Sequence, residues 1–122
     1  DAFTTINSPA ALDRELAAAR ADGQWVLVDY YADWCVSCKI MEKNVFGKTD
    51  VLEALSGVRL LRLDVTADND ASRELLKRYQ VPGPPTLLWL GPDGGERRQR
   101  RMTGEVSDRE FVEQWQVTRE QG

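Results

Sequence analysis

Two closely spaced cysteines follow an apolar run, and this arrangement restricts the local fold more than any other feature of the chain. The run over residues 25–31 is rich in β-branched and aromatic side chains, which is typical of a buried strand. Cys35 and Cys38 come shortly after it, and the residues that follow contain neither Gly nor Pro, so they can continue as a helix. The pattern predicts a strand–helix unit in which the cysteines open the helix, with the Cys35 sulfur exposed at the helix N-terminus.

Caps and turns predict the other elements. We expect a helix between Ser8-Pro9 and Asp22-Gly23, a helix capped by Asp50 and ending at Gly57, a strand over 58–65, a helix capped by Asn69 and running through Tyr79, a strand over 86–90, a turn over 91–95, a returning hairpin strand over 96–103, and a helix opened by the capping box Ser107–Glu110. Residues 118–122 are expected to fray. This order predicts an α/β fold, a central mixed β-sheet flanked by helices, with a C-terminal β-hairpin and helix.

Length and charge exclude several classes of protein. The chain has 122 residues, so we expect residues 1–122 to form a single domain. Its net charge of −4 argues against nucleic acid as a partner. It contains no histidine, which excludes Ser-His-Asp and Cys-His catalysis. It starts at Asp1 without a signal-peptide pattern, and we expect it to be a mature or excised piece.

The two cysteines favour redox chemistry over the alternatives. A closed zinc site needs four ligands, and this chain offers two thiols and no imidazole, so such a site would require a second copy. A purely structural bridge between Cys35 and Cys38 would close a very short loop and would remove little entropy from the unfolded chain. We therefore expect a redox-active Cys35–Cys38 disulfide, no further cofactor and no metal.

Two segments carry a resemblance to a known family. Residues 28–39 read Val-Asp-Tyr-Tyr-Ala-Asp-Trp-Cys-Val-Ser-Cys-Lys, and residues 83–87 read Gly-Pro-Pro-Thr-Leu. Together they resemble the thioredoxin superfamily. The details of 30–39, Glu42-Lys43, residues 63–67 and Thr103-Gly104 are most similar to the C-terminal periplasmic domain of the bacterial transmembrane thiol:disulfide interchange proteins. The resemblance implies a thioredoxin-like fold for the whole chain, excised from a larger membrane protein.

The resemblance also implies roles for single residues. Cys35 would be the nucleophile and Cys38 the resolving thiol. Pro85 would match the cis-proline that faces the disulfide and positions the partner's backbone. Trp34 and the Pro84-Pro85 loop would form a small apolar docking patch, although Trp34 could equally be a core residue. The pair Val36-Ser37 replaces the Gly-Pro of ordinary thioredoxin, and Pro84 lacks the N–H that usually precedes the cis-proline.

Asp29 and Glu42 would match two acids near the dithiol and take part in catalysis. Asp29 interrupts an apolar strand, so it needs either a functional reason or a salt bridge, with Lys39 or Arg62 as candidate partners. Glu42 could instead be a solvated surface residue. Carboxylates near Cys35 would oppose its thiolate more strongly than the helix N-terminus favours it. We therefore expect the domain to act as a reductant.

Other charged and aromatic residues have simpler interpretations. Trp25, Trp89 and Trp115 are expected in the core. The basic run Arg97, Arg98, Arg100 and Arg101 is expected to be a solvated face on the hairpin or, alternatively, a site for an acidic partner.

The resemblance implies electron transfer through the chain. Electrons would come from a transmembrane donor domain of the same polypeptide and go to its N-terminal periplasmic domain or another periplasmic thiol protein. The chain would be a monomeric periplasmic domain of a bacterial inner-membrane protein. Two alternatives stay open: a stand-alone thioredoxin-like reductase for cytochrome c maturation or a lipoprotein, and a non-enzymatic adaptor whose dithiol is incidental.

Overall fold

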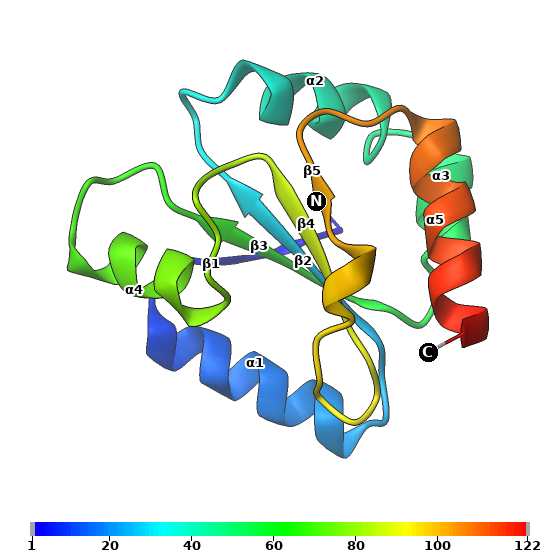
Figure 1. Cartoon of the computed structure of the whole chain (residues 1–122), viewed down its shortest axis with the longest axis horizontal. Helices are drawn as coiled ribbons and strands as arrows, with labels where there is room; N and C mark the ends of the chain where they lie inside the picture. The colour runs from blue at the N-terminus through cyan, green and yellow to red at the C-terminus, as the bar shows by residue number, and fades with distance from the viewer. Residues whose placement is uncertain (1, 122) are drawn as a thin grey trace.

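A five-stranded mixed sheet forms the centre of the computed structural model, which describes residues 2–121. The elements in chain order are β1 (Thr4–Ile6), α1 (Pro9–Ala21), β2 (Val26–Tyr31), α2 (Val36–Asn44), α3 (Thr49–Ala54), β3 (Arg59–Asp64), α4 (Asp70–Arg78), β4 (Thr86–Leu90), the 3-10 helix η1 (Arg98–Arg100), β5 (Met102–Thr103) and α5 (Asp108–Gln121). The strand order is β1-β3-β2-β4-β5 (Figure 1). β1 and β2 run parallel to β3, whereas β4 is antiparallel to both β2 and β5. The predicted α/β class and mixed sheet are confirmed.

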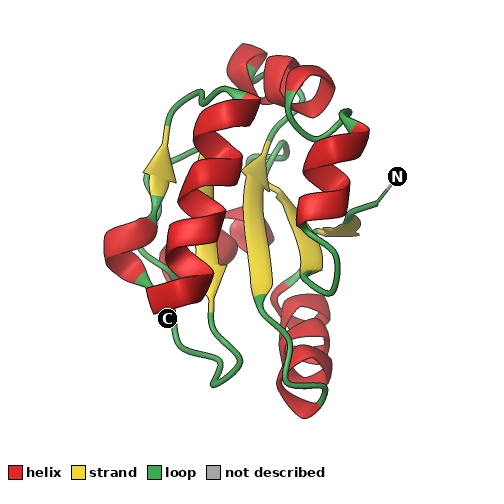
Figure 2. Ribbon diagram, turned by 90° about the vertical axis from the view of Figure 1, so that its right-hand side faces the viewer, coloured by secondary structure: helices red, strands yellow, loops and turns green. Residues whose placement is uncertain are grey.

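Helices cover both faces of the sheet (Figures 1 and 2). Successive side chains of a strand point to opposite faces. Val26, Val28 and Tyr30 of β2 therefore pack in the layer with α1 and α4, whereas Leu27 packs in the layer with α2, α3 and α5. Asp29 shares the second face with Leu27, although that face is otherwise lined with apolar side chains.

Most of the predicted helix starts are confirmed because capping is a local interaction. The Ser8 hydroxyl accepts a hydrogen bond from Ala11 N, and the Asn69 side chain accepts one from Ser72 N. At the start of α5, Ser107 Oγ accepts from Glu110 N while the Glu110 carboxylate accepts from Ser107 N. This is the expected reciprocal capping box.

The predictions for two helix termini, the start of α3 and the end of α5, are wrong. Asp50 does not cap α3, because the helix already begins at Thr49 after Lys48, and Asp50 accepts a hydrogen bond from Val51 N inside the first turn. Residues 118–121 do not fray, since α5 continues to Gln121 and Thr118 is buried. Residue 122 lies outside the described residues.

The predicted strand over 96–103 is also largely wrong. Only Met102–Thr103 forms a strand, Glu96 makes an isolated bridge to Leu90, and η1 lies between them. Two of the arginines are held by acids instead of lying on a solvated face: Arg97 contacts Asp93, and Arg101 contacts Glu96. Between the Glu96 bridge and Met102 the segment leaves the ladder and forms η1.

One edge of the sheet gathers the segments that matter for function. β2 and β3 end there, and β4, being antiparallel, begins there. Gly104 N, directly after β5, donates a hydrogen bond to the carbonyl oxygen of Pro85. The loop that carries the cysteines, the Pro84-Pro85 loop and the end of β5 therefore meet at this edge. No helix within residues 2–121 is long and apolar enough to cross a membrane.

Candidate active site

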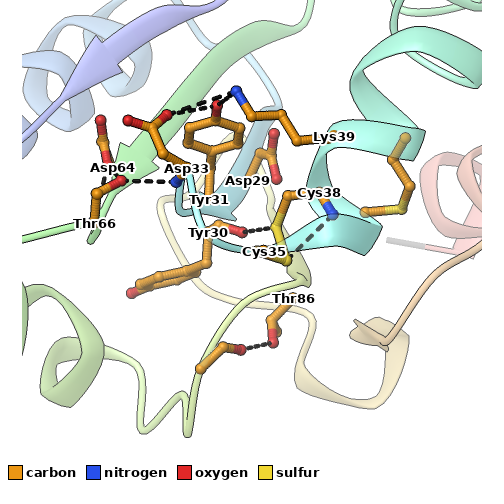
Figure 3. The surroundings of a disulfide bond; sticks show 12 residues. Asp29, Tyr30, Tyr31, Asp33, Cys35, Cys38, Lys39, Asp64, Thr66 and Thr86 are labelled. Carbon is orange, nitrogen blue, oxygen red and sulfur yellow. Dashed lines mark hydrogen bonds and ion pairs between the residues drawn. A yellow bond between two sulfur atoms is a disulfide. The ribbon is translucent and has the colours of Figure 1, made fainter.

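A disulfide joins Cys35 and Cys38 at the start of α2, with Cα atoms 5.2 Å apart (Figure 3). Cys35 is the N-cap residue of this helix, and its Sγ accepts a hydrogen bond of 3.2 Å from Cys38 N. Cys38 Sγ lies 3.9 Å from the carbonyl oxygen of Tyr30. The end of β2 and the first turn of α2 therefore hold the two sulfurs between them, as the strand–helix prediction requires.

The Cys35 sulfur is less exposed than predicted. Cys35 is 6% exposed and Cys38 is 3% exposed, because each sulfur is bonded to the other and packs against the first turn of α2. The residues on either side are open to solvent, with Trp34 63% and Val36 72% exposed. A visiting molecule would therefore meet an apolar rim before it meets the sulfur.

Asp29 lies on β2 in the surroundings of the disulfide (Figure 3) and is 4% exposed. The parallel register places it beside Arg62 of β3, and Arg62 Nε lies 3.5 Å from Asp29 Oδ2. Burial raises the pKa of Asp29 from 3.8 to about 7, because the cost of desolvating the carboxylate exceeds the attraction to Arg62. Of the two candidate partners for Asp29, the structure selects Arg62.

Glu42 of α2 reaches the same arginine. Its side chain is 42% exposed, and its Oε2 lies 3.5 Å from Arg62 Nη1. Glu42 is therefore neither fully solvated nor isolated, and Arg62 links it to Asp29. The sequence indicated Arg62 only as one possible partner of Asp29, and only the register of β2 against β3 shows that it contacts both acids.

Lys39, the other candidate partner of Asp29, makes different contacts. Its Nζ donates a 2.5 Å hydrogen bond to Tyr31 Oη and lies 3.7 Å from Asp33 Oδ1. Tyr31 Oη in turn donates to Asp33 Oδ1. This group lies on the solvent side of the Tyr31 ring.

Trp34 is held at the surface by the segment after β3, so it is not a core residue. Its Nε1 donates to the carbonyl oxygen of Thr66, and the preceding Asp33 N donates to Thr66 Oγ1 over 2.8 Å. Thr66 is fixed in turn by two hydrogen bonds to Asp64 Oδ1 (Figure 3). Thr66 lies in a segment used for the resemblance, but no local pattern in the sequence indicated its contact with Trp34.

The Pro84–Pro85 peptide bond is cis. Thr86 pairs with Tyr30, so Pro85 lies opposite the last residue of β2, close to the cysteine loop. Both prolines are half-buried. The structure thus brings Pro85 to the same sheet edge as the dithiol, and its role in positioning a partner stays a prediction.

The remaining tryptophans differ in burial. Trp89 and Trp115 are buried and stacked with centroids 4.6 Å apart, as expected for core residues. Trp25 is half-buried and packs edge-on against Trp115.

The part of the chain that the structure describes contains no set of side chains suited to bind a metal ion. Within residues 2–121, no group of three or more His, Cys, Asp or Glu side chains could hold a metal ion. Both thiols are already used in the disulfide. The Cys35–Cys38 disulfide is the redox-active group that the structure places at this site.

Comparison with known proteins agrees with this site. The pattern of the Thioredoxin-like family matches residues 6–92. The chain is 72% identical over 122 residues to thiol:disulfide interchange protein DsbD 2 of Pseudomonas aeruginosa, covering all of this chain and 21% of that protein. It is 72% identical over 120 residues to DsbD of a Pseudomonas species, again covering 21% of that protein. The chain thus spans about a fifth of the length of these relatives.

Solved structures agree at the level of the fold. The DsbD C-terminal domain of Neisseria meningitidis in the oxidised form superimposes with a TM-score of 0.81 at 30% identity, covering 93% of this chain and 98% of that one. A thioredoxin of Thermus thermophilus gives a TM-score of 0.73 at 30% identity, covering 97% and 88%. The chain belongs to the thioredoxin-like family and, within it, to the C-terminal domains of DsbD proteins.

Proposed function

We propose that residues 1–122 are the thiol:disulfide oxidoreductase domain of a larger membrane protein, which reduces a disulfide in a partner protein. The observation that carries the proposal is the Cys35–Cys38 disulfide at the N-terminus of α2, next to a buried acid and an exposed apolar rim. The DsbD relatives, of which the chain matches a fifth, support it.

The first step is attack by Cys35. In the reduced chain, the Cys35 thiolate attacks one sulfur of the partner's disulfide, whose S–S bond breaks as a bond from Cys35 forms. The released sulfur of the partner takes up a proton from water. Main-chain N–H groups of α2 favour the thiolate, since Cys38 N already donates to Cys35 Sγ.

Cys38 completes the exchange. Its thiolate attacks Cys35 Sγ, which re-forms the Cys35–Cys38 disulfide and releases the partner's second sulfur, so that two electrons have passed to the partner. Asp29 has a pKa of about 7, so near neutral pH it is present in part as the base that can accept the Cys38 proton. A donor dithiol then reduces the bridge again and becomes a disulfide itself.

Asp29 and Glu42 favour the reducing direction. Negative charge near the dithiol disfavours the Cys35 thiolate, and a less stable thiolate makes the disulfide form comparatively stable. A dithiol of this kind gives up its electrons readily, which suits a donor.

The docking surface is apolar. The exposed large apolar side chains among the described residues are Trp34, Val36 and Ile40, all at or near the start of α2. Pro84 and Pro85 border the same edge of the sheet. Pro84 has no N–H, so a docked partner strand finds one main-chain donor fewer here. Weak apolar contact suits partners that must be exchanged rapidly.

The relatives, of which the chain spans about a fifth, support a place for the domain in a larger membrane protein. The electron donor would be the transmembrane domain of the same polypeptide. The acceptor would be its N-terminal periplasmic domain or another periplasmic thiol protein. The domain would be a periplasmic domain of a bacterial inner-membrane protein, and it would act as a monomer.

Trapping tests the proposal. Cys38→Ser should accumulate a mixed disulfide through Cys35 when it is mixed with an oxidised partner, and mass spectrometry identifies that partner. The matched variant Cys35→Ser should trap nothing. The wild-type chain should reduce insulin disulfides in the presence of dithiothreitol, and Cys35→Ser should not. If Cys35→Ser reduced insulin at the wild-type rate, the dithiol would be incidental and the chain would be an adaptor.

A further inference from the structure

A buried arginine lies between the two acids of the site. The side chain of Arg62 is 6% exposed. Its Cζ lies 4.7 Å from the ring centroid of Phe3 and 5.2 Å from that of Tyr31. The guanidinium also lies 3.5 Å from both Asp29 and Glu42. Since it contacts two rings and two acids, it cannot turn toward solvent without losing these contacts.

The distances show how this charge is shared. Charge-assisted hydrogen bonds between guanidinium and carboxylate groups are usually about 2.7–2.9 Å long. Both contacts of Arg62 are longer, and each joins a single pair of atoms among those described. Neither of these two acids therefore holds the arginine in a close two-point pair, and both share its positive charge.

We propose that Arg62 is a positioning residue of the dithiol site, which sets how strongly Asp29 and Glu42 together oppose the thiolate form of Cys35. With Arg62 in place, its positive charge offsets the negative charge that Glu42 and the ionised fraction of Asp29 place near the sulfurs. Without it, Glu42 would oppose the thiolate without this compensation, while the pKa of Asp29, which Arg62 lowers, would rise and leave Asp29 uncharged near neutral pH. The proposal rests on the proposed function in one respect, which is that Cys35 is the attacking sulfur.

Other charged groups nearby largely cancel. Lys39 of α2 lies on the Tyr31 ring, 5.2 Å from its centroid, and forms an ion pair with Asp33. Both of these side chains are about half exposed or more, so water and salt screen them. Arg62 itself contacts Asp29 and Tyr31 from β2, Glu42 from α2 and the uncharged Phe3.

The test measures the Cys35 thiolate directly and needs no partner protein. In the reduced chain, the Cys35 thiolate displaces iodide from iodoacetamide, and the rate at each pH follows the thiolate fraction. Arg62→Met keeps an unbranched apolar stem, shorter than that of arginine, and removes the charge. We expect its Cys35 to react about threefold to tenfold more slowly at pH 7, with the rate profile moved to higher pH.

A matched control exists on the same strand. Arg59 also pairs with two acids, Glu15 and Asp22, but at the other end of β3. Arg59→Met should leave the Cys35 profile unchanged. Glu42→Gln should move the profile to lower pH, and Arg62→Met combined with Glu42→Gln should bring it back toward wild type.

Two further variants separate charge from structure. Arg62→Lys keeps the charge and should restore most of the wild-type profile. Arg62→Gln keeps hydrogen-bond donors but no charge, so it should shift the profile as Arg62→Met does, and it can replace that variant if Arg62→Met fails to fold. If the uncharged variants were less stable yet kept the wild-type profile, Arg62 would be purely structural and the proposal would be wrong. That result would not affect insulin reduction, so the two proposals fail separately.

Discussion

Two arginine–carboxylate pairs in this molecule are similarly buried but differently built. Arg101 and Glu96 have side chains 13% and 11% exposed and form two hydrogen bonds, of 2.6 and 2.9 Å. Arg62 and Asp29 have side chains 6% exposed and are joined by one contact of 3.5 Å. The first pair lies on the β4–β5 connection, and the second lies beside the dithiol.

The difference shows what each pair can do. Arg101 also donates to the carbonyl oxygens of Tyr79 and Gln80, so it links the connection between β4 and β5 to the end of α4. A bidentate pair of this kind holds both side chains in one geometry. Asp29 is under-compensated, and burial leaves its pKa near 7, where it can exchange protons. The closer pair is structural, and the looser one remains available for chemistry.

The largest effect is expected from replacing Asp29, the acid of the looser Arg62–Asp29 pair. Burial favours the uncharged form of Asp29, so its contribution to stability is complete below the unfolded pKa of 3.8 and is lost as the pH rises to about 7. At about 1.4 kcal/mol per pKa unit, the titration of Asp29 should cost the wild type roughly 4 kcal/mol of unfolding free energy over this range. Asp29→Asn should lack this loss, as measured by denaturant unfolding of the oxidised chain between pH 4 and 8.

The control for this prediction is Asp68→Asn, since Asp68 is 98% exposed. It should follow the wild-type curve. Parallel curves for wild type and Asp29→Asn would contradict the raised pKa of Asp29 and, with it, the contrast between the two pairs.

Removing the arginine of the closer pair, Arg101–Glu96, should lower the stability of the fold without changing the reactivity of Cys35. Arg101→Met leaves Glu96 and two carbonyl oxygens without their donor, so it should lower the unfolding free energy by about 3 kcal/mol or more. The alkylation profile of Cys35 should not change. Arg98→Met, at an exposed neighbouring position, should stay within about 0.5 kcal/mol of wild type. A shifted Cys35 profile in Arg101→Met would show that the two pairs are not independent.

The smallest effect on stability is expected from an exposed ion pair. Arg109 and Glu113 on α5 have side chains 87% and 62% exposed and lie 3.4 Å apart. Arg109→Gln should cost about 0.3–0.5 kcal/mol in low salt, and about 1 M salt should remove the difference. A loss above about 1 kcal/mol would mean that exposure does not determine the value of these pairs.

Local signals allowed much of the fold to be predicted. Ser8, Asn69 and the Ser107–Glu110 box fix helix starts through contacts within a few residues, so the sequence contains all the information needed. β1 was missed because it is three residues long, only Ile6 of it is buried, and its pairing with β3 is non-local. The strand over 96–103 was mispredicted because its composition does not reveal the 3-10 helix Arg98–Arg100, which separates the Glu96 bridge from β5.

The site was predictable only in part, for the same reason. Cys35 and Cys38 stand together in the sequence, and the unusual Asp29 is visible in an apolar run. The contact of Arg62 with both acids depends on the register of β3 against β2 and on the direction of α2. The contact between Thr66 and Trp34 likewise joins two loops that come together only at the sheet edge.

The position of Arg62 on β3 has a consequence for folding. Its neighbours in sequence, Leu61 and Leu63, point into the apolar layer with α1 and α4. If β3 slipped by one residue along β2, every side chain of the strand would change face. Arg62 would then enter that apolar layer and lose Asp29 as its cross-strand neighbour. The pair beside the dithiol therefore disfavours misaligned pairing of the two central strands while the chain folds.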